Sequence, residues 1–159
     1  MSIKQFFAKR LAKRAVNNTK KWMQNPIATQ ENVLKGLLKK AKNTTFGQDH
    51  HFSQINNYGD FVRRVPIRDY EGLRPYVDRV VAGETDILWP GKPRYFSKTS
   101  GTTSGIKYIP ISKESMPTHI KTAQNALYHY IYHSGNTSFV DGKMIFLQGS
   151  PTLSKTNGI

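Results

Sequence analysis

The sequence contains no cysteine, no long apolar run and few acidic residues. Without cysteine, neither a disulfide framework nor a thiolate metal site can form. No apolar run approaches the roughly 18–20 residues that a transmembrane helix requires. The amino terminus also lacks the short, uncharged apolar core of a secretory signal. We therefore expect a cytoplasmic protein without a transmembrane segment.

The scarcity of acidic residues leaves a strong positive charge. Lys and Arg number 24 against 10 Asp and Glu, which gives a formal net charge of +14. Such a balance favours anionic partners, namely nucleic acid, an acidic membrane face or phosphorylated small molecules. No recognised nucleic-acid-binding motif is present, so we expect no specific nucleic-acid partner.

The opening segment carries basic residues but no acidic residue before Glu31. Apolar residues recur in it at helical spacing, at Ile3, Phe7, Leu11 and Ala15. This pattern predicts an amphipathic helix that docks its apolar stripe on the body of the protein and leaves a solvated basic face. A membrane-surface helix or an organelle-targeting peptide is the alternative, although transit peptides are usually rich in serine.

Beyond this segment, helical patterns come first and strand patterns later. Helices are predicted over residues 26–41, 60–64, 70–81 and 112–133, with a turn over residues 43–47. Strands are predicted over residues 94–98, 108–111 and 144–147. Helices mixed with strands indicate an α/β arrangement. The 159 residues suffice for one domain, and no repeat or linker marks a boundary within them.

The most informative stretch lies between the first two predicted strands and reads Thr99-Ser100-Gly101-Thr102-Thr103-Ser104-Gly105-Ile106-Lys107. A phosphate chain carries several negative oxygens that must be held without covalent chemistry. Glycine lets backbone N–H groups approach those oxygens closely. Ser and Thr hydroxyls add donors, and a lysine supplies a point charge. The stretch therefore predicts a phosphate-binding loop, with a structural turn rich in Ser, Thr and Gly as the alternative.

The spacing of this loop excludes two better-known phosphate loops. The Walker pattern needs four residues between its glycines and a glycine directly before the lysine. Here three residues separate Gly101 from Gly105, and Ile106 precedes Lys107. The dinucleotide fingerprint G-x-G-x-x-G is also absent. Both of those loops lead into a helix, whereas the residues from Tyr108 on look extended, so this loop joins two strands.

The loop is similar to the ATP-phosphate loop of the adenylate-forming superfamily, T-S-G-T-T-G-x-P-K, from which Ser104 and Ile106 depart. The form S-G-T-T-S-G, followed by a lysine and then a proline three residues later, resembles the auxin-responsive (Gretchen Hagen) family of acyl acid–amido synthetases. Three other segments resemble that family in its order: N-T-x-F-G at residues 43–47, F-x-x-x-V-P-I-x-x-Y-E-x-L-x-P-Y at residues 61–76, and residues 139–151. The resemblance covers nearly the whole chain and is weakest in the basic opening helix.

The resemblance implies that residues 1–159 are the amino-terminal part of a single adenylate-forming large domain with a mixed sheet. The chain would then be an incomplete fragment that lacks the carboxy-terminal lid domain and is not catalytically competent alone. The intact protein would use ATP and Mg²⁺ to activate a carboxylic acid as an acyl-adenylate and transfer it to an amino acid amine. The triphosphate would be held by Thr99, Ser100, Gly101, Thr102, Thr103, Ser104, Gly105 and Lys107.

Two other interpretations stay open: a basic module that binds nucleic acid or a membrane, and an inactive remnant of the family. No catalytic residue and no metal ligand is predicted. His129 and His133 have a spacing that can hold a metal ion, but Tyr130 stands where a zincin needs glutamate, which favours packing roles. Asp69 and Glu71 lie at a predicted helix start, where carboxylates suit dipole stabilisation better than catalysis.

Overall fold

The computed structural model describes residues 2–99, 105–143 and 145. These residues form two compact units. The first unit contains residues 2–26, 116–143 and 145, and the second contains residues 27–99 and 105–115. None of the helices in these ranges is long and apolar enough to cross a membrane.

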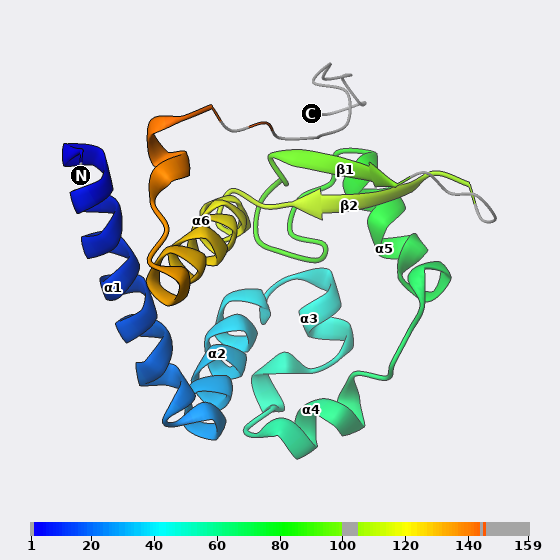
Figure 1. The fold of residues 1–159 in the computed structure, drawn as a ribbon. Helices are drawn as coiled ribbons and strands as arrows, with labels where there is room; N and C mark the ends of the chain where they lie inside the picture. The colour runs from blue at the N-terminus through cyan, green and yellow to red at the C-terminus, as the bar shows by residue number, and fades with distance from the viewer. Residues whose placement is uncertain (1, 100–104, 144, 146–159) are drawn as a thin grey trace. The chain divides into compact units, whose positions relative to one another are not determined.

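The first unit contains α1 (Ile3–Met23), nearly all of α6 (Ser115–Ser134) and the 3₁₀-helix η2 (Ser138–Asp141) (Figure 1). A capping box starts α1, because the Ser2 hydroxyl accepts from the Gln5 N–H and the Gln5 side chain accepts from the Ser2 N–H. The same side chains reach η2. Ser2 Oγ donates to Asp141 at 2.8 Å, and Gln5 Nε2 donates to Asp141 at 2.6 Å. The start of α1 is thereby tied to η2.

The buried face of α1 differs from the predicted one. Ile3, Phe7 and Leu11 are 78%, 56% and 46% exposed. The core of this unit is instead built from Ala8, Ala12 and Ile131, with Tyr128, Phe139 and Val140 packed against it. The prediction of a docked apolar stripe is therefore wrong. The small side chains lie on the buried face because they let α1 approach its neighbours closely.

The helix predicted over residues 112–133 begins three residues later, at Ser115. Ser112 precedes it, and its Oγ accepts a hydrogen bond from the Ser115 N–H at 3.0 Å. Of the predicted apolar face, Ile131 is buried, whereas Ile120 and Leu127 are exposed. The strand predicted over residues 144–147 lies outside the described residues except for Ile145.

The second unit contains most of the helices and both strands. In chain order its elements are nearly all of α2 (Pro26–Ala41), then α3 (Thr45–Asp49), η1 (Phe52–Gln54), α4 (Tyr58–Arg64), α5 (Tyr70–Val81), β1 (Tyr95–Thr99) and β2 (Lys107–Ile111). Polar side chains cap three of the helices, because Thr44, Asn57 and Asp69 each accept a backbone N–H three residues further on. The helices predicted over residues 26–41, 60–64 and 70–81 are confirmed.

The turn predicted over residues 43–47 instead contains the start of α3. Thr44 is 1% exposed; its Oγ1 donates to the Ala41 carbonyl oxygen at 2.7 Å and accepts from the Gly47 N–H at 3.0 Å. The N–H groups of the next two residues donate to the carbonyl oxygens of Asp86 and Ile87. Because these partners are distant in the sequence, the local pattern of turn-forming residues does not reveal the helix.

The two described strands, β1 and β2, pair antiparallel. Tyr95 lies opposite Ile111, and Thr99 lies opposite Lys107. The strands predicted over residues 94–98 and 108–111 are confirmed to within one residue. The predicted order of helices followed by strands is also confirmed. Across the described ranges the α/β chain is mostly helical, with this small antiparallel sheet.

Candidate phosphate-binding site

The β1–β2 hairpin holds together the two ends of the predicted phosphate loop. Thr99 at the end of β1 is the pairing partner of Lys107 at the start of β2. Gly105 has a φ of 76°, a left-handed conformation that favours glycine. The remaining predicted loop residues lie outside the described residues: Ser100, Gly101, Thr102, Thr103 and Ser104. Their contacts with phosphate stay predictions.

The hairpin carries two lysines next to this loop. Because successive strand residues point to opposite faces, Lys107 shares a face with Thr99, and Lys98 shares the other face with its partner Tyr108. The Lys98 Nζ lies 5.5 Å from the centre of the Tyr108 ring. Phe96 packs edge-on against the same ring, with 5.9 Å between centroids. One lysine therefore belongs to each face of the hairpin at its loop end.

Tyr70, the first residue of α5, links this helix to β2. Its hydroxyl oxygen accepts a hydrogen bond from the Tyr108 N–H at 2.9 Å. The Lys107 Nζ lies 5.5 Å from the centre of the Tyr70 ring, and the guanidinium carbon of Arg74 lies 5.4 Å from it. Aromatic rings attract cations at such distances. Tyr70 therefore places two cations of different elements around one ring.

Glu71 is the carboxylate that neighbours these cations. Arg74 donates to it twice, from Nε at 2.7 Å and from a terminal nitrogen at 2.8 Å. These hydrogen bonds are the largest effect and lower the pKa of Glu71; desolvation opposes them, and the charges of Arg74 and Lys107 lower the pKa further. The same pairing raises the pKa of Arg74. Glu71 is therefore an ionised partner of Arg74 rather than a poised general base.

We call this group the hairpin cluster, and it consists of Tyr70, Glu71, Arg74, Lys98, Lys107 and Tyr108. It contains three cations and one carboxylate, so its formal charge is three minus one, or +2. An electropositive group at the loop end of a hairpin suits an anionic ligand. The charge balance therefore fits phosphate oxygens.

The His, Asp and Glu side chains of the described residues do not gather into a group of metal ligands. The described part of the chain contains no group of three or more His, Asp or Glu side chains that could hold a metal ion. The one carboxylate of the hairpin cluster, Glu71, is already engaged by Arg74.

The other residues considered from the sequence have structural contacts. Asp69 caps α5 by accepting from the Gly72 N–H at 2.9 Å. His129 Nε2 lies 3.0 Å from the Thr19 hydroxyl, within hydrogen-bond distance. The His129 and His133 rings lie 6.0 Å apart between centroids. These contacts agree with the helix-start and packing roles predicted for them.

Two residues of the hairpin cluster, Tyr70 and Arg74, are functional candidates that the loop motif does not contain. The available signal was the Y-E-x-L motif beginning at Tyr70, within the segment 61–76 that resembles the family. That motif shows which residue types stand there but does not indicate what the Tyr70 and Arg74 side chains contact. The role follows only from the packing of α5 against β2, which joins Tyr70 and Tyr108 across 38 residues of sequence.

A second cluster that sequence reasoning missed surrounds His50, which is 5% exposed. Its Nδ1 lies 2.8 Å from the Phe46 carbonyl oxygen, and its Nε2 lies 2.9 Å from Arg68. Because a carbonyl only accepts and a guanidinium only donates, the proton is assigned to Nδ1. The Phe46 ring stacks on His50 at 4.1 Å and meets Tyr76 edge-on at 5.1 Å. This cluster fastens α3 to α5.

Solved structures define the class of protein to which this fold belongs. One is AtGH3.15 acyl acid amido synthetase in complex with 2,4-DB, with a TM-score of 0.69 and 24% identity over 77% of this chain and 22% of that chain. Another is GH3.15 acyl acid amido synthetase, with a TM-score of 0.68 and 25% identity over 80% of this chain and 23% of that chain. The fold is therefore that of part of an acyl acid amido synthetase.

The family follows from a model described as the GH3 family N-terminal domain, which matches residues 15–159. This chain belongs to the GH3 family, as the sequence predicts. Indole-3-acetic acid-amido synthetase GH3.15 of Arabidopsis thaliana is 28% identical over 133 residues, which are 82% of this chain and 22% of that protein. Jasmonoyl–L-amino acid synthetase JAR6 of Nicotiana attenuata is 27% identical over 131 residues, which are 81% of this chain and 22% of that protein. The chain thus spans about a fifth of these curated relatives.

Proposed function

We propose that this chain supplies the phosphate-binding part of an ATP-dependent ligase that joins a carboxylic acid to an amino acid amine. Family membership supports this proposal, because relatives are named as an acid-amido synthetase and an acyl–amino acid synthetase. A further relative is a 4-substituted benzoates-glutamate ligase of Arabidopsis thaliana. The acids named in these relatives differ, so only the class of the acid and of the amine is proposed. Since the chain spans about a fifth of its relatives, the complete activity would need a longer protein.

The observation that carries the proposal is the pairing of Thr99 with Lys107 beside the cations of the hairpin cluster. In the proposed role, backbone N–H groups and hydroxyls between these two residues donate to the triphosphate oxygens. Lys107 offsets part of the phosphate charge, and Tyr70 fixes its position through the ring contact. Preorganised donors of this kind stabilise charge without reorganisation during the reaction.

The proposed reaction has two steps that balance. A carboxylate oxygen of the acid attacks the α-phosphorus of ATP, the bond to the leaving phosphate breaks, and pyrophosphate departs. The amine nitrogen then attacks the acyl carbon, the acyl–oxygen bond breaks, and AMP leaves as a proton is released. Mg²⁺ supplied with ATP would offset negative charge on the phosphates. In this proposal the residues of this chain hold the phosphates.

Carboxylate-dependent exchange of labelled pyrophosphate into ATP tests the first step in a protein that contains this chain and the rest of the family's length. We expect exchange with the native sequence and at least a tenfold loss in the double variant Ser100→Ala, Thr102→Ala, in line with the loss of charge-stabilising donors. The double variant Ser53→Ala, Thr122→Ala removes one serine and one threonine hydroxyl from η1 and α6 instead of the loop and should exchange normally. Equal pyrophosphate-exchange rates in both variants would show that the loop hydroxyls take no part in the first step.

The competing interpretation is an inactive remnant of the family. The same exchange assay distinguishes a remnant from an active ligase. A remnant would bind MgATP without any carboxylate-dependent exchange. A basic module would instead bind duplex DNA or other polyanions with a steep salt dependence and no preference for ATP. Exchange that depends on both the carboxylate and the loop hydroxyls is expected from the ligase alone.

A further inference from the structure

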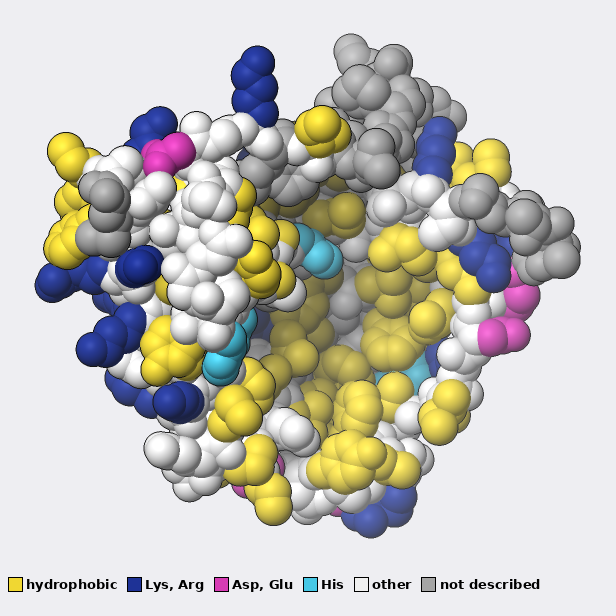
Figure 2. All heavy atoms as spheres, in the orientation of Figure 1, with side chains coloured by type: hydrophobic (Ala, Val, Ile, Leu, Met, Phe, Trp, Pro, Cys, Tyr) yellow, Lys and Arg dark blue, Asp and Glu magenta, His cyan; other side chains and the backbone are white. Residues whose placement is uncertain are grey.

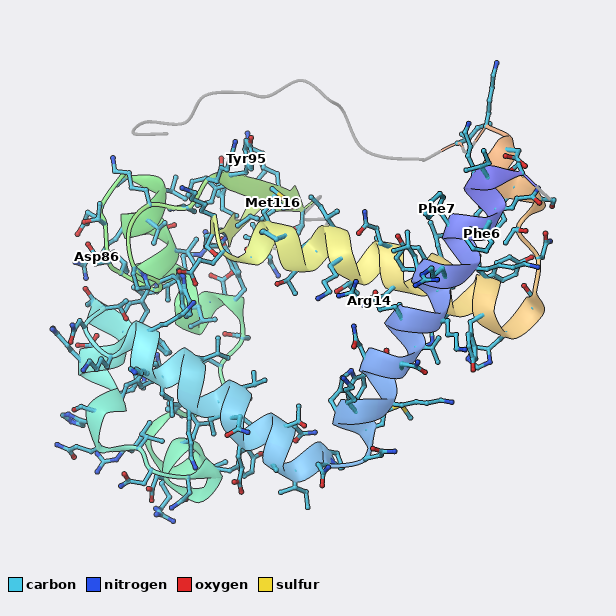
Figure 3. The ribbon with its side chains drawn as sticks, turned by 90° about the vertical axis from the view of Figure 1, so that its left-hand side faces the viewer. Phe6, Phe7, Arg14, Asp86, Tyr95 and Met116 are labelled. Carbon is cyan, nitrogen blue, oxygen red and sulfur yellow. The ribbon has the colours of Figure 1, made fainter. Side chains whose placement is uncertain are left out.

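The solvent-facing side of α1 combines apolar and basic side chains. We call this side the outer face of α1, and it consists of Ile3, Phe6, Phe7, Arg10, Leu11 and Arg14, with buried Ala8, Ala12 and Val16 turned the other way. Figure 2 shows apolar and basic side chains beside one another over α1, and Figure 3 labels Phe6, Phe7 and Arg14 along the helix. Phe6 and Phe7 are 50% and 56% exposed and meet edge-on at 5.7 Å.

The charge of α1 has one sign. The helix carries seven cations and no acidic residue: Lys4, Lys9, Arg10, Lys13, Arg14, Lys20 and Lys21. None of the ion pairs found in the described part of the chain uses any of them. A shallow groove on this helix is lined by apolar and basic side chains together, among them Phe7, Arg10, Leu11 and Arg14. The charge complementary to this surface is negative.

The family match begins at residue 15, so every residue of the outer face precedes the region that the family model covers. The inner face of α1 is already occupied, since Ala8 and Ala12 pack in the core with Ile131. A partner can thus bind the outer face without opening this unit.

We propose that the outer face of α1 docks on the surface of an anionic phospholipid membrane. A nucleic-acid backbone would engage the cations and leave Ile3, Phe7 and Leu11 in water. An anionic lipid surface engages both kinds of side chain, because the apolar residues enter the headgroup boundary while Lys and Arg meet the lipid phosphates. The helix lies in the plane of the interface and does not span the bilayer. The phosphate loop lies on other elements, so this proposal is independent of the proposed ligase activity.

Cosedimentation of the 159-residue chain with vesicles tests the proposal. We use phosphatidylcholine vesicles with and without about 30% phosphatidylserine, a content that gives the negative surface potential to which basic segments respond. We expect at least tenfold stronger binding to the anionic vesicles, with the difference shrinking as salt is raised. Equal binding to both kinds of vesicle, or none to either, would overturn the proposal.

Variants then separate lipid docking from simple charge attraction. Phe7→Gln with Leu11→Gln should weaken vesicle binding at least tenfold, because two side chains lose their apolar burial. The matched double variant Ile27→Gln with Val33→Gln changes two exposed apolar residues of α2 and should bind like the native chain. Far-ultraviolet circular dichroism verifies that all variants keep their helix content.

A charge variant completes the set. Arg10→Gln with Arg14→Gln should weaken binding to anionic vesicles roughly thirtyfold, at about fivefold for each charge near the surface. Lys35→Gln with Lys39→Gln removes the same charge from α2 and should have a much smaller effect. If the charge variant loses binding while Phe7→Gln with Leu11→Gln keeps it, the surface is a general polyanion site. Duplex DNA would then compete fully with the vesicles, and lipid docking is refuted.

Discussion

Residue 47 lies where α3 passes the end of α2. A Cβ atom at this position would overlap the carbonyl oxygen of Ala41, and the Gly47 N–H donates to the buried Thr44 hydroxyl. We expect Gly47→Ala to lower the free energy of unfolding by about 2–3 kcal/mol, because the backbone must shift to relieve the overlap. Gly36 is the matched control, since a Cβ there would meet no atom within 4 Å.

Gly36→Ala should raise the free energy of unfolding by about 0.5–1 kcal/mol, because alanine restricts the unfolded chain and favours the helix interior. Urea unfolding followed by circular dichroism measures both variants. Similar effects of the two substitutions would contradict the close approach of α3 and α2 at Gly47.

The Glu71–Arg74 pair should make the free energy of unfolding depend on pH. Arg74 lowers the pKa of Glu71 in the folded chain, first through hydrogen bonds and then through its charge. A folded pKa below the unfolded one contributes stability above the unfolded pKa, about 4.3, and that stability is lost as the pH falls through the folded pKa. Glu84, paired with Arg79, acts in the same direction. Both pairs are exposed, so the effect is small and decreases with salt.

Titration of Glu71 by NMR measures this effect directly. We expect Arg74→Gln to raise the Glu71 midpoint towards the ordinary glutamate value, because both the hydrogen bonds and the charge are removed. Lys107→Gln should raise it less, because Lys107 contributes charge alone. A Glu71 midpoint that moves with neither substitution would show that the carboxylate is unpaired in solution.

At the scale of elements, the packing of α1 depends on its small residues. Ala12 is fully buried against Ile131, whereas its neighbour Leu11 is 46% exposed. We expect Ala12→Leu to lower the free energy of unfolding by about 1–3 kcal/mol through overpacking. Leu11→Ala should change it by less than about 1 kcal/mol. Thermal and urea unfolding measure both effects. A larger loss of stability in Leu11→Ala than in Ala12→Leu would show that the predicted apolar stripe is the buried face.

The connection between α5 and β2 depends on one hydroxyl. Tyr70→Phe keeps the ring that contacts Lys107 and Arg74 but removes the acceptor of the Tyr108 N–H. We expect the free energy of unfolding to fall by about 1 kcal/mol, which is the typical net contribution of one hydrogen bond. Tyr58→Phe changes a tyrosine that is 68% exposed and should be neutral. Faster hydrogen exchange at the Tyr108 amide in the first variant alone would support the link, and unchanged exchange would contradict it.

Elements with a strong local signal were predicted well. The helix over residues 70–81 has a capping aspartate and a clear period, and the two strands flank a loop of glycines and hydroxylated residues. Periodicity predicted the helical spacing of α1 but not its buried face. That face is set by packing against Ile131, which is distant in the sequence. The short helix α3 was missed for the same reason, because its first amides pair with the segment near Asp86.

The candidate site shows the same division between local and distant information. Thr99, Gly105 and Lys107 follow from residue types and spacing, since glycines, hydroxyls and a lysine are the groups that phosphate requires. Tyr70 and Arg74 could not be assigned in this way, because their positions depend on how α5 packs against β2. The sequence predicts the phosphate donors, and tertiary contacts show which residues pack against the strand that follows them.

At the scale of the whole molecule, the excess of positive charge includes two separate groups of cations. The hairpin cluster lies in the second unit and offers its cations next to a predicted phosphate loop. The cations of α1 lie in the first unit and are interspersed with exposed apolar residues. A net charge of +14 is therefore compatible with two anionic ligands of different kinds, a nucleotide and a lipid surface.

Isothermal titration of MgATP into the 159-residue chain tests most directly whether the hairpin loop binds phosphate. We expect saturable binding that pyrophosphate competes for and that weakens at least fivefold in Ser100→Ala with Thr102→Ala, because two donors to the phosphates are lost. Ser53→Ala with Thr122→Ala should bind like the native chain. Binding that is equal in all three proteins, or no binding to the native chain, would contradict the assignment of residues 99–107 to the phosphates of ATP.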